Sequence, residues 1–446
     1  MSEHGSTNTQ HLWAPRAWVH GRWRESVLLE VAADGTWQRV APGTPHTPAM
    51  HALPGPVLPG LVNAHSHAFQ REFVGQAERR DGEHDDFWSW RDRMYGVALA
   101  TTPERLREVA RHLYVELLRG GYTQVCEFHY LHHAPDGSRY GDSLAMSRAL
   151  VQAARDAGIG LTLLPVLYER AGFAAAGLRD DQRRFAATVD DVLALRDGVR
   201  ALAAPNVSAG VAIHSLRAAR APSILALAER LDGDTAPIHI HIAEQTAEVD
   251  DCVAATGLRP IDWLARHVRL DPRWQLVHAT HAAPAEIDAV AASGAGVVLC
   301  PSTEANLGDG VPDLPRWLAG STALSIGSDS QVTRDWREEL RLLEYSQRLT
   351  LRRRNVAAAP QAGEPSTAAR LFERMLAGGA GAAGLGTTGL QAGARADLLV
   401  VDAADPALAG RDGEHLLDTL VFSSPTRPFA RVMVGGSWVR GEGAPG

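Results

Sequence analysis

The central part of the chain alternates short apolar runs with longer segments of helical periodicity. Eight apolar runs occur, each followed by a helical candidate such as residues 103–121, 143–158 or 335–353. The runs occupy residues 56–65, 122–130, 159–168, 207–215, 236–244, 274–281, 294–302 and 322–330. Continuous apolar strands that alternate with helices are typical of a parallel sheet covered on both faces. Eight such units over roughly 250 residues or more predict an α/β fold, a (β/α)8 TIM barrel.

The two ends of the chain have a different pattern, in which aromatic and β-branched residues alternate with polar ones. This pattern, interrupted by Gly, Pro and Asp, predicts short strands and turns. The predicted strands lie within residues 11–23, 26–43, 393–408 and 429–443. We therefore expect one small β-sandwich domain built from both termini, residues 1–57 and 388–446, with the barrel domain over residues 58–387.

The composition narrows the classes of function. The chain has 446 residues and a net charge of −8, with no basic block, so we expect no nucleic-acid partner. No apolar run reaches membrane-spanning length, and the N-terminal sequence lacks the basic and apolar segments of a secretory signal. The three cysteines, Cys126, Cys252 and Cys300, lie far apart, which favours a reducing cytoplasm.

Lysine is absent from the chain, and all 44 basic residues are arginine. This absence excludes a Schiff-base lysine and a phosphate-binding P-loop lysine. It also excludes a carboxylated lysine that bridges two metal ions. Any metal site must therefore be built from other side chains, such as imidazoles and carboxylates.

Residues that carry chemistry cluster where the predicted strands end, which is where the active sites of such barrels lie. The first strand ends in His65 and His67, and because side chains alternate along a strand, both imidazoles face the same side. The later strands end in Glu127, His129, Tyr130, His214, Arg217, His239, His241, Glu244, His278, His281 and Asp329. Imidazoles and carboxylates that converge in this way suit a divalent metal ion.

The residue types alone leave alternatives open. An isolated His-x-His pair also suits a polar surface turn, and Asp329 also suits the N-cap of a helix. Of His239 and His241, we favour His241 as a ligand, because it lies nearer the end of the strand. We expect His239 to be a packed imidazole. His278 is favoured over His281 because it directly ends an apolar run.

Four motifs together resemble the amidohydrolase superfamily over the whole chain. They are "PGLVNAHSHA", "HIHIAEQ", "LVHATH" and "SIGSDS". Within the superfamily, "HSHAFQR" followed by "FWSWRDRMY" is similar to the N-formimino-L-glutamate deiminases, enzymes of histidine degradation. The resemblance implies a metal-dependent hydrolase, usually a homodimer, with the fold predicted above.

The resemblance also implies roles for individual residues. His65, His67, His241 and Asp329 match the metal ligands, Glu244 matches the proton-shuttling glutamate, and His278 matches the catalytic histidine, which acts with Asp329. Three imidazoles and one carboxylate suit Zn²⁺, whose bound water loses a proton near neutral pH. With no lysine to bridge a second ion, we expect one zinc ion per chain. Glu127 and His129 match no role.

A further group resembles the family's substrate-binding residues: Gln70, Arg91, Tyr130, His214 and Arg217. Two arginines suit a substrate with two carboxylates, because guanidinium and carboxylate groups pair through two parallel hydrogen bonds. In a chain with 44 arginines, a solvated surface charge is the alternative for each. The chain departs from the family at Gln331, where a histidine is usual.

The resemblance therefore implies zinc-dependent hydrolysis of N-formimino-L-glutamate to N-formyl-L-glutamate and ammonia. One alternative is a deaminase of a cyclic amidine such as guanine or a pterin, with the same metal site and fewer arginines at its mouth. An alternative of another class is a barrel that has lost catalysis and serves as a scaffold. The retained ligand set disfavours the scaffold.

Overall fold

Eight parallel strands close into a barrel in the computed structural model, which describes residues 9–80, 86–411 and 413–439. The barrel strands are β6 (Leu61–Ser66), β7 (Tyr122–His129), β8 (Gly160–Leu167), β10 (Val211–Ile213), β11 (Ile238–Ile242), β12 (Trp274–His278), β13 (Gly296–Leu299) and β14 (Ala323–Ile326). Strand β8 pairs with β10, and β14 pairs with β6, which closes the ring. Each of the eight predicted runs contains one barrel strand, so the predicted barrel is confirmed.

The barrel strands are buried along their length, except for Ala323 at the start of β14. Every residue of β7 and β8 is buried, as expected for parallel strands covered on both faces. The short strand β9 (Val207–Ala209) precedes β10, and Gly210 separates the two. A Cβ atom at Gly210 would lie 2.4 Å from the carbonyl oxygen of Pro237, so only glycine fits this approach.

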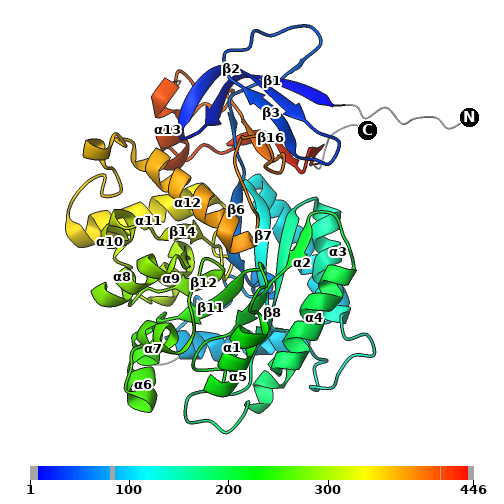
Figure 1. Cartoon of the computed structure of the whole chain (residues 1–446), viewed down its shortest axis with the longest axis vertical. Helices are drawn as coiled ribbons and strands as arrows, with labels where there is room; N and C mark the ends of the chain where they lie inside the picture. The colour runs from blue at the N-terminus through cyan, green and yellow to red at the C-terminus, as the bar shows by residue number, and fades with distance from the viewer. Residues whose placement is uncertain (1–8, 81–85, 412, 440–446) are drawn as a thin grey trace, which may run out of the picture.

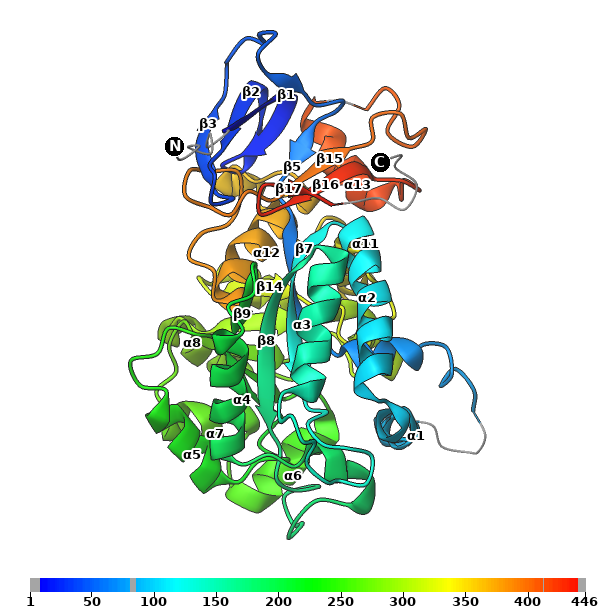
Figure 2. The same ribbon diagram turned by 90° about the vertical axis from the view of Figure 1, so that its right-hand side faces the viewer.

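Helices surround the barrel (Figures 1 and 2). They are α1 (Phe87–Ala100), α2 (Pro103–Arg119), α3 (Ala145–Ala157), α4 (Val189–Ala201), α5 (Ala221–Arg230), α6 (Thr246–Thr256), α7 (Pro260–His267), α8 (Pro284–Ser293), α9 (Pro301–Leu307), α10 (Leu314–Ala319), α11 (Trp336–Leu351) and α12 (Thr367–Ala383), whereas α13 (Leu416–Phe422) lies beside the strands of the chain termini. Helix α2 shows why these segments are helical. Its N-cap Thr102 accepts a hydrogen bond from the amide of Arg105, Pro103 occupies its first turn, and its apolar residues form one buried face.

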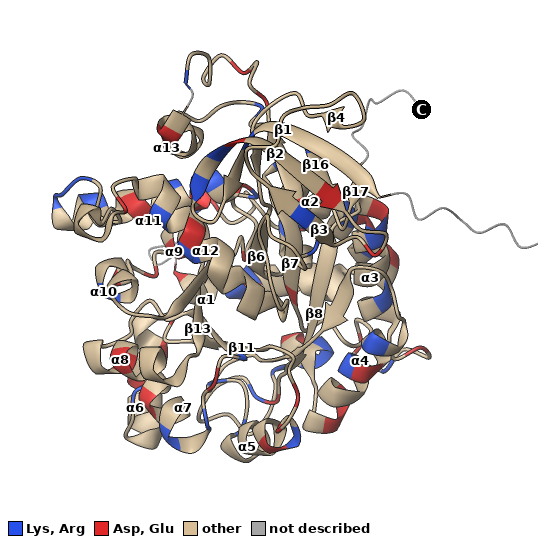
Figure 3. Ribbon diagram, turned by 45° about the horizontal axis from the view of Figure 1, so that its top comes forward, with Lys and Arg blue, Asp and Glu red and all other residues tan. Residues whose placement is uncertain are grey.

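Outer helices such as α4 and α11 carry charges of both signs (Figure 3). The figure shows no single-sign stripe along these two helices. Among the described residues, no helix is long and apolar enough to cross a membrane.

Strands from both termini form a second, mixed sheet beside the barrel (Figure 1). They are β1 (Gln10–Val19), β2 (Arg22–Val31), β3 (Trp37–Ala41), β4 (His51–Ala52), β5 (Val57–Leu58), β15 (Leu398–Val401), β16 (Phe429–Val434) and β17 (Ser437–Trp438). This sheet packs around its own apolar cluster, which includes Trp37, Leu398 and Met433. The expected small β structure built from both termini is therefore confirmed, and its strands, predicted as a β-sandwich, belong to one mixed sheet.

The terminal sheet lies at the opposite end of the barrel from the predicted site residues of β6. Strand β5 of this sheet leads directly into the N-terminal end of β6, whereas His65 lies at the other end of β6. The proposed domain limits, at 57/58 and 387/388, stay a prediction. Residues 1–8, 412 and 440–446 of the predicted terminal domain and 81–85 of the predicted barrel domain lie outside the described residues.

Candidate active site and metal centre

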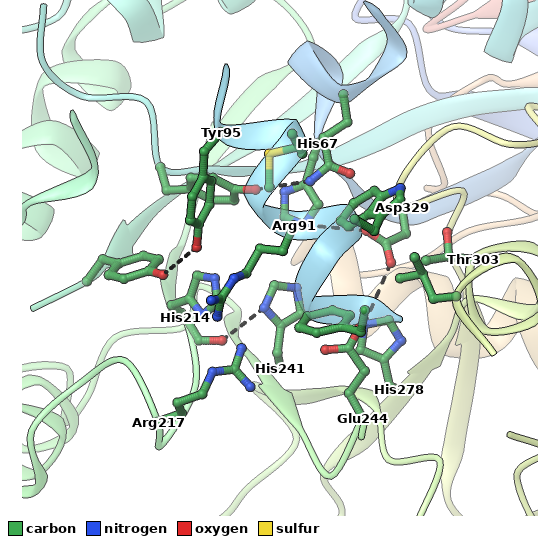
Figure 4. A pocket seen from close by; sticks show the side chains of 17 residues that line it. His67, Arg91, Tyr95, His214, Arg217, His241, Glu244, His278, Thr303 and Asp329 are labelled. Carbon is green, nitrogen blue, oxygen red and sulfur yellow. Dashed lines mark hydrogen bonds and ion pairs between the residues drawn. The ribbon is translucent and has the colours of Figure 1, made fainter. Parts of the chain in front are cut away.

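The predicted site residues meet in one pocket at the C-terminal ends of the barrel strands (Figure 4). Ten of the eleven line this pocket: His67, Gln70, Arg91, Tyr130, His214, Arg217, His241, Glu244, His278 and Asp329. The eleventh, His65, is completely buried and contacts His67, His241 and Asp329. The pocket encloses about 500 Å³ of space outside the protein atoms, including its open mouth.

Three imidazoles and one carboxylate converge closely enough to hold a metal ion. The Nε2 atoms of His65 and His67 lie 3.5 Å and 3.4 Å from Oδ1 of Asp329. The Nε2 atoms of His65 and His241 lie 2.9 Å apart. In a tetrahedral zinc site with bonds of about 2.0–2.1 Å, neighbouring ligand atoms are about 3.4 Å apart. His65, His67 and Asp329 are therefore spaced like ligands around one ion, and His241 adjoins them through His65.

In His67 and His241, a hydrogen bond at Nδ1 leaves Nε2 free to bind a metal ion. Nδ1 of His67 donates to the carbonyl oxygen of Phe128, and Nδ1 of His241 donates to that of His214, both at 2.9 Å. Burial lowers the pKa of His65 to about 3 and lowers that of His67 and His241, so these imidazoles are neutral. Each Nε2 that is not protonated then presents a lone pair to the cluster. Such lone pairs repel one another unless a cation lies between them, so the donor set fits a bound metal ion.

The backbone holds the carboxylate of Asp329 beside the two histidines of β6. The amide of Asp329 donates to the carbonyl of His65 at 2.9 Å, and the amide of His67 donates to the carbonyl of Asp329 at 3.2 Å. Gly327 permits this approach, because a Cβ atom there would lie 2.6 Å from Cβ of His65. Burial alone would raise the pKa of Asp329, but His65 and His67 lower it below its ordinary range, so the carboxylate is ionised.

Buried hydrogen bonds fix the segment that carries His65 and His67. Nε2 of Gln331 donates to the hydroxyl of Ser66 at 3.0 Å and to the carbonyl of Asp329 at 2.6 Å. The hydroxyl of Ser66 donates to the carboxylate of Glu127 at 2.9 Å, and the amide of Ala68 also donates to Glu127. Glu127, which the sequence left without a role, therefore supports the His-x-His segment. Gln331 links that segment to the backbone of Asp329.

Glu244 and His278 face the ionised Asp329 across the pocket (Figure 4). Nε2 of His278 lies 3.6 Å from Oε1 of Glu244 and 3.7 Å from Oδ2 of Asp329. Burial raises the pKa of Glu244 to about 7, where a carboxyl group can both accept and release a proton near neutral pH. Burial opposes a charge on His278, but Glu244 raises its pKa above the ordinary value. His278 has φ +70°, a strained backbone conformation of the kind that clusters at functional sites.

Two arginines form a cationic wall beside this acid–base group. The guanidinium of Arg91, on α1, lies 4.6 Å from the centre of the Trp88 ring, and that of Arg217 lies 5.3 Å from the same ring. Arg217 is only 5% exposed, and its Nη1 has no hydrogen-bond partner among the described residues. Nε of Arg91 is also buried without one within this part of the chain. Because a buried N–H without an acceptor is costly, both groups are suited to an anionic ligand.

Gln70, Tyr130 and His214 complete the predicted substrate group. Nε2 of Gln70 donates to the hydroxyl of Tyr130 at 3.0 Å, and the ring of His214 packs against Tyr168, with ring centres 4.3 Å apart. Burial lowers the pKa of His214, so its imidazole is neutral beside the cationic Arg217.

Two further tyrosines of the pocket wall were not identified from the sequence. Tyr95, on α1, and Tyr168, after β8, line the pocket, and Nε2 of Gln182 donates to both hydroxyls at 3.0 Å. Gln182 lies in the short helix η2 (Asp180–Phe185). A signal was present for Tyr95, which follows Arg91 by four residues and therefore shares its helix face.

The alternative histidines lie outside the metal cluster. His239 is two residues nearer the N-terminal end of β11 than His241, and its Nε2 donates to the carbonyl of Ala382 at 2.8 Å, so it is a packed imidazole as expected. Nε2 of His281 donates to the carbonyl of Asp309 at 2.8 Å. His129 packs against the ring of His132 and does not line the pocket.

The fold and the site define a metal-dependent hydrolase barrel, and the chain belongs to the amidohydrolase family, which residues 57–439 match. It is 46% identical over 433 residues to the formimidoylglutamate deiminase of Pseudomonas aeruginosa, an alignment that covers 97% of this chain and 95% of that protein.

Two solved structures show the same architecture. The crystal structure of an amidohydrolase from Brucella melitensis superposes with a TM-score of 0.91 at 41% identity, covering 96% of this chain and 94% of that one. An adenosine deaminase from Xanthomonas campestris, solved with bound zinc, superposes with a TM-score of 0.78 at 23% identity, covering 96% and 92%. The second likeness concerns the fold alone.

Proposed function

We propose that this protein hydrolyses N-formimino-L-glutamate to N-formyl-L-glutamate and ammonia. The observation that carries the proposal is the pairing, in one pocket, of a metal-ligand cluster with two arginines, each of which has a buried nitrogen, Nε of Arg91 and Nη1 of Arg217, without an acceptor among the described residues. The identity to formimidoylglutamate deiminase over nearly the whole chain supports the same substrate.

The proposed cofactor is one zinc ion per chain, held by His65, His67, His241 and Asp329. The neutral imidazoles and the ionised carboxylate suit zinc, and the zinc bound by a structural neighbour supports this choice. When bound, zinc supplies a Lewis acid that lowers the pKa of a water ligand. The absence of lysine removes one group, a carboxylated lysine, that could bridge to a second ion, so one ion is the simpler count.

The two arginines would hold the glutamate part of the substrate. Formiminoglutamate carries two carboxylates, and a guanidinium pairs with a carboxylate through two charge-assisted hydrogen bonds. Trp88 lies against both guanidinium groups and limits their contact with water. A neutral nucleobase would offer no carboxylate to Nε of Arg91 and Nη1 of Arg217, which weighs against the cyclic-amidine alternative.

Glu244, His278 and Asp329 would move the protons. Water adds to the formimino carbon, the bond from that carbon to the terminal nitrogen breaks, and the nitrogen leaves as ammonia. Asp329, whose carboxylate is ionised, accepts the proton from water, His278 assists by holding the water through a hydrogen bond, and Glu244 delivers a proton to the departing nitrogen. His278 also donates a hydrogen bond to the tetrahedral intermediate. Its Nε2 lies 3.6 Å from Glu244, whose carboxylate favours the protonated ring that this hydrogen bond requires.

A substrate panel tests this proposal. Purified zinc-loaded protein is incubated with N-formimino-L-glutamate, N-formimino-L-aspartate, guanine and a pterin, and released ammonia is measured. We expect the highest kcat/KM with formiminoglutamate. A higher value with guanine or the pterin would replace the proposal with the cyclic-amidine alternative, and no release from any compound would favour the scaffold.

Two further expectations stay predictions. A homodimer is expected from the family resemblance, and sedimentation of the purified protein would decide it. A cytoplasmic location agrees with the three buried free cysteines, Cys126, Cys252 and Cys300.

A further inference from the structure

His278 is surrounded by carboxylates on both edges of its ring. Its Nε2 faces Glu244 and Asp329 in the pocket. On the opposite edge, its Nδ1 lies 3.4 Å from Oε1 of Glu304, within hydrogen-bond distance. Glu304 is 2% exposed and does not line the pocket, so it reaches the reaction only through His278.

The position of Glu304 is fixed by its own backbone surroundings. Glu304 lies on α9, and its Oε1 accepts a hydrogen bond from the amide of Cys300 at 2.9 Å. The same oxygen faces Nδ1 of His278, and a carboxylate oxygen can only accept there. Nδ1 must therefore carry a proton, and Nε2 is left to face the reacting atoms.

We infer that Glu304 is a positioning residue that fixes the orientation of the His278 ring and selects the ring nitrogen with which His278 meets the substrate. The inference rests on the proposed hydrolysis and adds to it a residue outside the pocket. A buried carboxylate is costly unless it is paired, and His278 is the only cationic partner within ion-pair distance of Glu304 among the described residues. A neutral oxygen would suffice to accept the hydrogen bond from the amide of Cys300 at the start of α9. The charge on Glu304 is therefore explained by its pairing with His278.

Helix α9 offers a matched comparison for the capping role. Glu339 is as deeply buried as Glu304 and also binds the start of α9, accepting from the amide of Ser302 at 2.9 Å and from its hydroxyl at 2.6 Å. Glu339 makes no hydrogen bond or ion pair with His278 among the described residues. A change at Glu339 therefore disturbs the same helix without reaching the catalytic ring.

The test compares Glu304→Gln, Glu304→Met and Glu339→Gln in the zinc-loaded enzyme. Gln keeps the accepting oxygen and removes the charge, whereas Met removes both. We expect kcat for formiminoglutamate to fall about 10-fold in Glu304→Gln and about 100-fold in Glu304→Met. KM and zinc content should stay within about twofold of wild type, and Glu339→Gln should keep its kcat within the same range.

Three results would overturn the inference. They are an unchanged kcat in both Glu304 variants, an equal loss in Glu339→Gln, and a rise in KM with no change in kcat. If Glu304→Met does not fold, the Gln variant alone decides these outcomes.

A second measurement does not depend on the substrate. Nitrogen-15 NMR of histidine-labelled enzyme, with the His278 signals assigned by their loss in His278→Gln, reports which ring nitrogen is protonated. We expect a proton on Nδ1 in the wild type, and an unprotonated Nδ1 would refute the role of Glu304. If the wild type releases no ammonia from formiminoglutamate, the proposed function fails, while the NMR result still decides the question of Glu304.

Discussion

Replacing Arg217 by Met tests whether the pocket is built for a dicarboxylate. Met keeps much of the apolar contact with Trp88 and removes the guanidinium. Arg217 is 5% exposed, and its Nη1 has no protein acceptor among the described residues, so its strongest partner should be the substrate.

The size of the effect follows from this burial. Truncating one partner of a desolvated charge pair costs roughly 2 to 5 kcal/mol. Since each 1.36 kcal/mol changes a rate tenfold, kcat/KM for formiminoglutamate should fall by about 30- to 5,000-fold. Stability should not fall with it, because an unpaired buried cation is itself costly.

The assay is steady-state ammonia release with formiminoglutamate and with an uncharged formamidine. Zinc content and thermal unfolding of the variant are measured in parallel. Arg220→Met is the matched control, because Arg220 lies three residues further along the same loop, is exposed, and does not line the pocket. We expect the control to keep kcat/KM within about twofold of the wild type.

Equal losses on both substrates would refute this reasoning. In that case Arg217 would support the fold or the metal site, and the dicarboxylate interpretation would lose its main physical support. A loss confined to formiminoglutamate, with zinc content unchanged, is the expected result.

Three other changes test separate parts of the mechanism and the fold. Glu244→Gln should keep zinc but lose on the order of 10²-fold or more in kcat, and loss of zinc would mean that Glu244 is a ligand. Asp329→Asn should weaken zinc binding by at least about 10²-fold in chelator competition and lower the Tm in excess zinc, whereas unchanged affinity would remove it from the ligand set. Burial raises the pKa of Glu339 to about 8 from 4.5, so its contribution to stability is present at low pH and is lost as pH rises. Urea unfolding should therefore show wild type losing stability relative to Glu339→Gln between about pH 5 and pH 8, and a constant difference would contradict this.

The barrel could be predicted from the sequence because most residues of its strands are apolar. Strands such as β8 and β13 are buried on both faces, so they form nearly continuous apolar runs. The same geometry explains why His65 and His67 could be identified. Barrel strands direct their C-terminal residues towards one common space, so residue types at strand ends predict a shared site.

Residues that act through long-range hydrogen bonds could not be predicted in this way. Glu127, Glu304 and Gln182 each bind partners on other elements of the barrel, and no local spacing indicates such partners. Tyr130 and His129 show that residue type near a strand end does not by itself identify the residues that line the pocket. They are neighbours in sequence, but His129 is the last residue of β7 and Tyr130 is the first residue after it, and only Tyr130 lines the pocket.

The central claim concerns which bond is hydrolysed at the proposed zinc site, and isotope labelling of the products tests it most directly. Zinc-loaded enzyme is incubated with N-formimino-L-glutamate in water enriched in oxygen-18, and the products are identified by mass spectrometry. We expect one equivalent of ammonia for each N-formyl-L-glutamate, with a single labelled oxygen in the formyl group and no turnover by Asp329→Asn. Formation of glutamate and formamide would show that the other carbon–nitrogen bond is broken, and would contradict the roles proposed for Glu244 and His278.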